Sequence, residues 1–106
     1  MKATILHNPR CSKSREALAI LHETEAEVSV IDYLEHPPTR DELARLYARA
    51  GMSPRDGLRE DASNVANDDD ALDLMTRDPS TIERPLVETD KGVRLGRPPS
   101  AIKDIL

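Results

Sequence analysis

Apolar residues in the first third of the chain change their spacing at clear breaks, and the spacing predicts a strand, a helix and a second strand. Residues 3–6 form a short continuous apolar run that ends at His7-Asn8-Pro9, which is typical of a buried strand. In residues 12–24 the apolar positions recur at helical spacing, so we expect an amphipathic helix. Residues 28–33 are rich in β-branched and apolar side chains and indicate a second strand.

Two prolines interrupt the chain after this unit, and the pattern then becomes helical. Thr39 and Glu42 have the spacing of a capping box. The apolar residues of positions 43–50 follow on one helical face, and Gly51 is a typical C-terminal stop. These signals predict a helix that begins just after Thr39 and ends at Gly51.

The next stretch predicts further helices separated by a polar loop. Residues 54–59 indicate one short helical turn. Residues 63–70 are polar, and we expect a loop whose last Asp residues begin another helix, because acidic side chains are favourable at a helix N-terminus. Asp78-Pro79 ends that helix. Together these elements form a helical insert at about 39–78.

The C-terminal part of the chain predicts a hairpin and a last helix. Residues 86–87 and 93–95 are apolar and flank Thr89-Asp90-Lys91-Gly92, which has the composition of a turn. Pro98 can start a final helix, because proline is well tolerated at the first helical position. The side chains that we expect on the buried side of this helix are Ala101, Ile102, Ile105 and Leu106.

The expected elements follow the order β-α-β, then helices, then β-β-α. This order indicates an α/β fold in which a mixed four-stranded sheet carries flanking helices and a helical insert. Strands at both ends of an insert match a thioredoxin-like domain. A chain of 106 residues has the length of one domain with a single modest core, so we expect residues 1–106 to form one domain.

The composition argues against several classes of protein. The formal net charge of -5 argues against a general nucleic-acid surface, because phosphate neutralisation needs clustered Lys and Arg. The apolar run at the N-terminus is far too short for a membrane span or a leader peptide. The one cysteine cannot form an intrachain disulfide, and together these features point to the reducing cytoplasm.

Cys11 stands where the first strand ends and the first helix begins, and this position favours a reactive thiol. Unpaired backbone N–H groups and the helix dipole put positive partial charge there, and Arg10, Lys13 and Arg15 add formal charge. Such surroundings lower the pKa of a cysteine from about 8.5 into a range of about 3.5–7.5. The alternative is a buried structural cysteine, which is the usual fate of a lone Cys.

Two neighbouring side chains can act on this sulfur or on a bound anion. His7 lies upstream of Cys11 and can donate toward the sulfur. Ser14 lies three residues downstream, on the same side of the helix, and can hydrogen-bond the sulfur or an oxyanion held by the free N–H groups. A loop-capping role for His7, and no role for Ser14, stay open as alternatives.

Three arginines have the chemistry to hold a tetrahedral oxyanion beside a thiolate. Arg84 and Arg97 each precede a proline, which restricts their backbone to extended geometry, and Arg59 ends a short turn. A planar guanidinium group binds such anions through two hydrogen bonds at once. Taken singly, each of the three is more often a surface arginine, and spacing alone does not select them from the others in the chain.

Four short segments stand out together, and they are spread in a consistent order over nearly the whole chain. They are His7-Asn8-Pro9 with Cys11-Ser12 and Ser14-Arg15, then Tyr33-Leu34-Glu35 with Pro37-Pro38-Thr39-Arg40, then Arg84-Pro85-Leu86-Val87, and Gly96-Arg97-Pro98-Pro99. This set resembles the active-site signature and the later motifs of the glutaredoxin-dependent arsenate reductases. The chain stops soon after the last motif, which is similar to the shorter members of that family.

The resemblance implies a fold and a reaction. The fold is thioredoxin-like with a helical insert, and the reaction is the reduction of arsenate to arsenite. Cys11 would attack arsenate and form a thiol–arsenate adduct. Glutathione would act as the co-substrate that attacks this adduct, and glutaredoxin would resolve the mixed disulfide. The resemblance implies neither a metal site nor a bound cofactor.

The resemblance also implies roles for individual side chains. His7 matches a residue that lowers the pKa of the thiol, and Pro85 matches the cis-proline of the fold. The stretch that follows Arg59 is shorter than the usual insert of the family, so Arg55, one turn away, is an alternative for the first arginine role. The implied oxyanion ligands are Arg59, Arg84 and Arg97.

The cysteine count bears independently on the source of electrons. With no second cysteine, no internal disulfide can release the product, so an external thiol must supply the electrons. Two other functions stay open. One is a thioredoxin-fold regulator that binds RNA polymerase, although many such proteins carry a Cys-x-x-Cys switch and position 14 here is serine. The other is a thiol oxidoreductase that acts on another substrate.

Overall fold

The computed structural model describes residues 1–106, and its centre is a four-stranded sheet with the strand order β2-β1-β3-β4. β1 pairs in parallel with β2 and antiparallel with β3, and β3 pairs antiparallel with β4. The mixed four-stranded sheet predicted from the sequence is therefore confirmed. The elements are β1 (Lys2–His7), α1 (Ser12–Glu23), β2 (Glu27–Asp32), α2 (Arg40–Ala50), η1 (Pro54–Gly57), η2 (Glu60–Ala62), α3 (Asp68–Arg77), η3 (Pro79–Thr81), β3 (Leu86–Thr89), β4 (Gly92–Leu95) and η4 (Pro99–Ile105).

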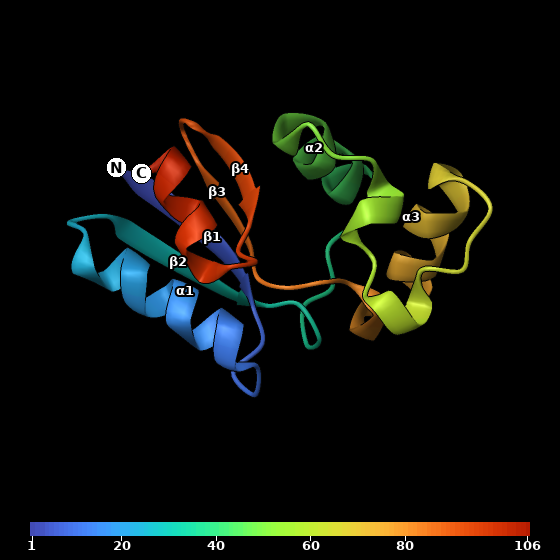
Figure 1. Cartoon of the computed structure of the whole chain (residues 1–106), viewed down its shortest axis with the longest axis horizontal. Helices are drawn as coiled ribbons and strands as arrows, with labels where there is room; N and C mark the ends of the chain where they lie inside the picture. Colours follow the sequence, from blue (N-terminus) through green and yellow to red (C-terminus); the bar gives the residue numbers. More distant parts are fainter.

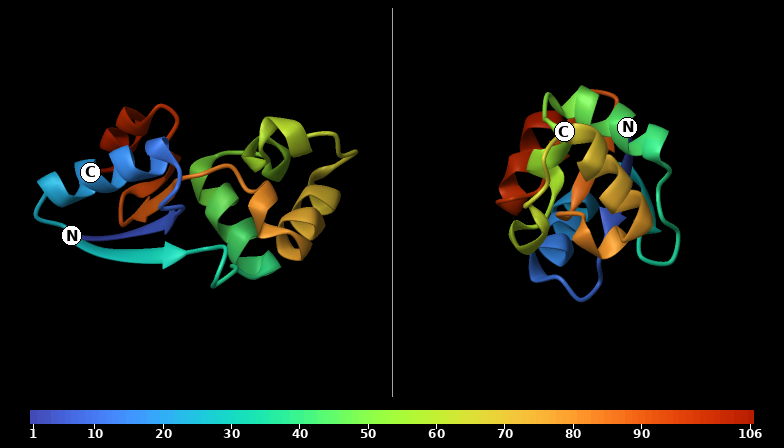
Figure 2. Two further views of the ribbon diagram at one scale, coloured as in Figure 1. Left: turned by 90° about the horizontal axis from the view of Figure 1, so that it is seen from below. Right: turned by 90° about the vertical axis from the view of Figure 1, so that its right-hand side faces the viewer.

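Successive side chains of the central strands point to opposite faces of the sheet, and each face has its own apolar cluster. Ile5 and Val87 belong to a cluster that α1 and η4 complete. Leu6 and Leu86 belong to a larger cluster that the helical insert completes. Figure 1 and the left view of Figure 2 show α1 and η4 stacked on one side of the strands, with the insert beside the sheet as a second lobe.

The insert contains the helices predicted between positions 39 and 78, and η3 extends it to Thr81. Thr39 is the N-cap of α2, and its hydroxyl accepts a hydrogen bond from the Glu42 backbone N–H at 3.1 Å. The Glu42 carboxylate forms an ion pair with Arg45 instead of returning to Thr39, so only half of the predicted capping box forms. No helix in the structure has both the length and the apolar content needed to cross a bilayer.

The last element differs from the prediction, because residues 99–105 form the 3-10 helix η4 rather than an α-helix that starts at Pro98. Its buried residues are Pro99, Ile102 and Ile105, which repeat at intervals of three, and three residues make one turn of a 3-10 helix. Ala101 and Leu106, which we expected on the buried side, are only half-buried.

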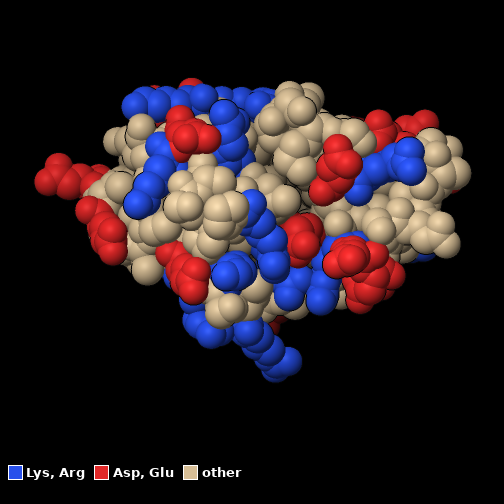
Figure 3. Space-filling model, viewed as in Figure 1, with Lys and Arg blue, Asp and Glu red and all other residues tan.

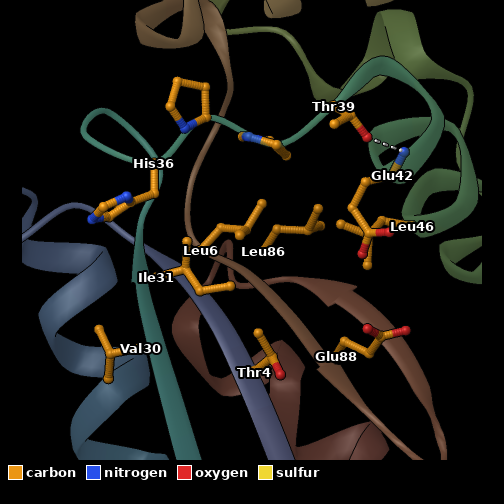
Figure 4. Close-up of a pocket in the computed structure, with 12 residues that line it drawn as sticks. Thr4, Leu6, Val30, Ile31, His36, Thr39, Glu42, Leu46, Leu86 and Glu88 are labelled. Atoms are coloured by element: carbon orange, nitrogen blue, oxygen red, sulfur yellow. Dashed lines mark hydrogen bonds between the residues drawn. The ribbon is translucent and has the colours of Figure 1, made fainter.

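β2 is an edge strand, and its side chains are more exposed to solvent than its β-branched sequence indicates. β2 pairs only with β1, and Val30 is 49% exposed. Beside it, on the sheet face opposite α1, lies an apolar groove of about 530 Å³. Figure 4 shows Leu6, Ile31 and Leu86 at the floor of this groove, with Glu42 at its rim. No cysteine lines the groove, so the thiol chemistry lies elsewhere.

Candidate functional site

Cys11 is the N-cap residue of α1, as the strand-to-helix junction in the sequence predicts. Its backbone is extended (φ -95°, ψ 122°), and no side chain caps the helix, so the first N–H groups of α1 face the sulfur end of the residue. The backbone N–H of Cys11 donates to the Asn8 carbonyl at 3.0 Å, which closes a turn between β1 and α1. The residue is 8% exposed, so its sulfur is largely withdrawn from water.

The electrostatic surroundings favour the thiolate of Cys11. Burial alone would raise its pKa, but hydrogen bonds from the backbone N–H groups of Ser14 and Lys13, with the charges of Arg84 and Arg97, bring the pKa below that of an ordinary cysteine. The basic side chains that we expected to act, those of Arg10, Lys13 and Arg15, are exposed to solvent. The charges that act on the sulfur therefore come from residues far away in the sequence.

His7 and Ser14 contact each other rather than the sulfur. His7 Nδ1 lies 2.6 Å from Ser14 Oγ, and the Asn8 backbone N–H donates to the same oxygen at 3.0 Å. Burial lowers the pKa of His7, opposed by the carboxylate of Asp32, so the neutral ring is favoured at physiological pH. No hydrogen bond joins the ring to Cys11, so the direct donation from His7 to the sulfur that we expected does not occur in this structure.

Arg97 joins Cys11 to Arg84, because two of its nitrogens donate hydrogen bonds to these two residues. Its Nη2 donates to Cys11 Sγ at 3.6 Å, and its Nε donates to the Arg84 carbonyl at 2.9 Å. The peptide bonds from Arg84 to Pro85 and from Arg97 to Pro98 are both cis. The two arginines that precede prolines in the sequence therefore meet in space, and one of them contacts Cys11.

A polar pocket of about 520 Å³ brings the three predicted arginines together. Arg59, Arg84 and Arg97 line it, whereas Arg55 lines a separate hollow with Ser53 and other residues. The side chain of Arg84 is 13% exposed, and its Nε is a buried donor without a hydrogen-bond partner. Between the two candidates for the first arginine role, Arg59 is thus the one that shares a pocket with Arg84 and Arg97.

The structure also brings in two residues that we did not single out from the sequence. Glu83 lines the same pocket, and its carboxylate faces both Arg84 and Arg97. Tyr33 is buried beside the site, where burial raises the pKa of its hydroxyl and the side chain of Asn8 and the charge of Arg84 oppose the rise. Tyr33 lies within a motif quoted above and Glu83 directly precedes another, but their spacing in the sequence carries no signal that they lie near the same site.

The charges on the surface are mixed. On the face shown in Figure 3, basic and acidic side chains alternate across the middle of the molecule, between the sheet and the helical insert. No single sign dominates this face, in keeping with the formal net charge of -5. No group of three or more His, Cys, Asp or Glu side chains is placed to hold a metal ion.

A Ser14→Ala variant separates the backbone contribution of Ser14 from that of its hydroxyl. The variant keeps the N–H that lowers the pKa of Cys11 but removes the oxygen that joins His7 to Asn8. Because the thiolate is the reactive form, a lowered pKa moves the pH midpoint of alkylation by iodoacetamide to lower pH. We expect that midpoint to stay below that of free cysteine in the variant, while the free energy of unfolding falls by about 1–3 kcal/mol.

The matched control is Ser12→Ala, which removes an exposed hydroxyl from the first residue of α1. It should change neither the alkylation midpoint nor the free energy of unfolding measurably. A midpoint that rises to the value of free cysteine in Ser14→Ala alone would contradict this interpretation, because the hydroxyl would then be the group that sustains the thiolate.

The chain is similar to known proteins over nearly its whole length. The sequence model described as the ArsC family matches residues 6–105. An arsenate reductase of Escherichia coli is 41% identical over 97% of this chain and 79% of its own length, and one of Rhizobium meliloti (strain 1021) is 38% identical over 100% and 82%. The solved structure of an arsenate reductase from Vibrio cholerae superposes with a TM-score of 0.89 at 39% identity, covering 100% of this chain and 98% of that one.

Proposed function

This chain belongs to the ArsC family, and we propose that it reduces arsenate with Cys11 as the nucleophile. The similarity to arsenate reductases extends over nearly the whole chain, so the protein is an oxidoreductase of this class with a thioredoxin-like fold. One observation carries the proposal for the site. The guanidinium of Arg97 reaches Cys11 Sγ at 3.6 Å, and the same side chain lines the polar pocket to which Arg59 and Arg84 also contribute.

In the proposed first step, the Cys11 thiolate attacks arsenic, and one arsenate hydroxyl leaves as water after taking the proton of a second hydroxyl of the same anion. A new S–As bond forms, an As–O bond breaks, and arsenic stays pentavalent. The guanidinium groups of Arg59, Arg84 and Arg97 would hold the arsenate oxygens, because they are planar donors that match a tetrahedral anion. The unpartnered Nε of Arg84 supports this role, since a bound oxyanion would supply the acceptor that this buried donor lacks.

In the proposed second step, an external thiolate attacks the Cys11 sulfur. The electron pair of the S–As bond passes to arsenic, which leaves as trivalent arsenite, and two thiols become one mixed disulfide. Cys11 is the only cysteine, so no internal thiol can take this part. We propose glutathione as the external thiol and glutaredoxin as the protein that removes the glutathione moiety from Cys11, in the reducing cytoplasm.

His7 and Ser14 support the nucleophile indirectly in this proposal. The backbone N–H of Ser14 stabilises the thiolate, and its hydroxyl ties the buried His7 ring to the turn that precedes α1. Pro85 follows Arg84 in the cis form and sets the direction in which the chain enters β3. These positions give each of the three residues a structural role beside the reacting atoms.

The test is a coupled assay of the purified chain with arsenate, glutathione, glutaredoxin, glutathione reductase and NADPH. We expect NADPH consumption that requires arsenate, and that falls to the background rate when either glutathione or glutaredoxin is omitted. Consumption without arsenate would instead indicate a thiol oxidoreductase of another substrate. If no thiol supply supports arsenate reduction by the wild-type chain, the proposal is wrong.

A further inference from the structure

Glu83 places a carboxylate inside the polar pocket that Arg59, Arg84 and Arg97 line, which we call the oxyanion pocket. Its Oε1 lies 3.3 Å from Arg97 Nη2 and 3.5 Å from Arg84 Nη1, and it also accepts a hydrogen bond of 3.4 Å from the Arg84 backbone N–H. The side chain is 21% exposed, so the carboxylate is largely withdrawn from water. An acidic group therefore already stands where two of the three guanidinium groups converge.

The same nitrogen of Arg97 serves both Glu83 and the nucleophile. Arg97 Nη2 donates to Cys11 Sγ at 3.6 Å and lies 3.3 Å from Glu83 Oε1. An oxyanion that binds between this pocket and the sulfur must share Arg97 and Arg84 with the Glu83 carboxylate. The oxygens of the bound anion then lie beside the Glu83 carboxylate, which accepts hydrogen bonds, as well as beside the guanidinium N–H groups, which donate them.

The balance of charge in the pocket sets the charge of the anion that it accepts best. Arg84 and Arg97 carry two positive charges, which the Glu83 carboxylate and the Cys11 thiolate match, so Arg59 supplies the remaining positive charge of the pocket. Arg59 Nε lies 3.9 Å from Asp61 Oδ1, and the carboxylates of Asp61 and Glu60 line the exposed rim of the pocket, where solvent screens them. This balance favours an anion with a single negative charge over a dianion.

Hydrogen bonding to Glu83 also favours an anion that carries a proton. An ionised carboxylate only accepts hydrogen bonds, so an oxygen beside Glu83 is stable there if it carries a proton to donate. Arsenate and phosphate keep at least one hydroxyl at neutral pH, whereas sulfate has none. We propose, on the basis of the oxyanion site assigned above, that Glu83 is a specificity-determining residue that selects protonated oxyanions over sulfate.

The test measures how well phosphate and sulfate protect Cys11 of the folded chain from alkylation by iodoacetamide, in wild type and in Glu83→Gln. Glutamine keeps the shape of the side chain, loses the charge and offers an N–H donor. We expect phosphate to protect the wild type at much lower concentration than sulfate. In Glu83→Gln the protecting concentration of sulfate should fall at least about tenfold, the effect of one additional charge-assisted hydrogen bond, while that of phosphate changes by less than about threefold.

Two further variants make the result specific to this carboxylate. Glu83→Ala removes the charge without adding a donor, and it should also improve protection by sulfate relative to phosphate. Glu60→Gln removes a charge from the rim of the same pocket, and it should change protection by both anions by a similar factor. An unchanged sulfate-to-phosphate ratio in both Glu83 variants overturns the inference, as does a shift of that ratio in Glu60→Gln as large as in Glu83→Gln.

This experiment is independent of turnover. If the Glu83 variants lose the discrimination while the wild-type chain reduces no arsenate, the inference holds and the proposed reaction is wrong. If the chain reduces arsenate and the Glu83 variants keep the discrimination, the reaction holds and the inference is wrong. If neither anion protects Cys11 of the wild type at any concentration, both the inference and the oxyanion site on which it rests are wrong.

Discussion

Replacement of Cys11 by serine should lower arsenate reduction to the uncatalysed rate, a loss of at least about 10⁴-fold in kcat. The reason is twofold. A serine hydroxyl stays protonated in the field that lowers the pKa of the thiol, and an oxygen atom at this position cannot form the mixed disulfide that supplies the two electrons. The coupled NADPH assay measures the loss, and the chain has no other cysteine that could take over.

Two controls belong with this variant. Cys11→Ser should keep the oxyanion pocket, because Arg97 keeps its contacts with the Arg84 carbonyl and Glu83, and phosphate should still stabilise the variant against thermal unfolding. The double variant Cys11→Ser with Ser12→Cys moves the thiol one residue along α1 and should stay inactive, because the sulfur then leaves the N-cap position. Arsenate reduction by Cys11→Ser above a few per cent of wild type would rule out a covalent adduct on this residue.

Replacement of Arg97 by lysine should lower kcat/KM for arsenate by about 10²-fold, although the formal charge is conserved. Arg97 uses separate nitrogens for separate partners, since Nη2 donates to Cys11 Sγ and Nε donates to the Arg84 carbonyl. A lysine ammonium is a single point donor and cannot hold both contacts while it also binds an arsenate oxygen. The pH midpoint of Cys11 alkylation should change little, because the positive charge remains.

The matched control is Arg94→Lys, on the neighbouring strand β4. Arg94 donates to the Val93 carbonyl and pairs with Asp104, and it does not line the oxyanion pocket. Its conversion to lysine should leave kcat/KM within about twofold of wild type. If Arg97→Lys is as active as Arg94→Lys, only the charge of Arg97 matters, and the separate roles that we propose for its nitrogens are wrong.

Several features of this protein follow from local patterns in the sequence. The position of Cys11 at the start of α1 was predictable because a helix N-terminus is a local structure, formed by residues that are close neighbours in the chain. The N-cap role of Thr39 and the left-handed Gly51 that ends α2 (φ 67°) followed from the same kind of short-range rule. Apolar periodicity predicted the order of strands and helices for the same reason.

Local rules were less informative where tertiary contacts compete with them. The capping box formed only in part, because the Glu42 carboxylate finds Arg45, which in turn also pairs with Glu88 of β3. The last helix became a 3-10 helix, because η4 packs Ile102 and Ile105 into the cluster beneath α1 at a spacing of three. In both cases a partner from elsewhere in the fold decided between local alternatives.

Which distant side chains join Cys11 in the site was decided by the tertiary structure. By itself the sequence determined a cysteine at a helix start and a chain with one thiol, since both depend on residue identity and short-range geometry. It could not choose Arg59 over Arg55, nor place Glu83 against Arg97. Those distances join segments tens of residues apart, and they are set by the strand order and by the packing of the insert against the sheet, which no periodicity along the chain encodes.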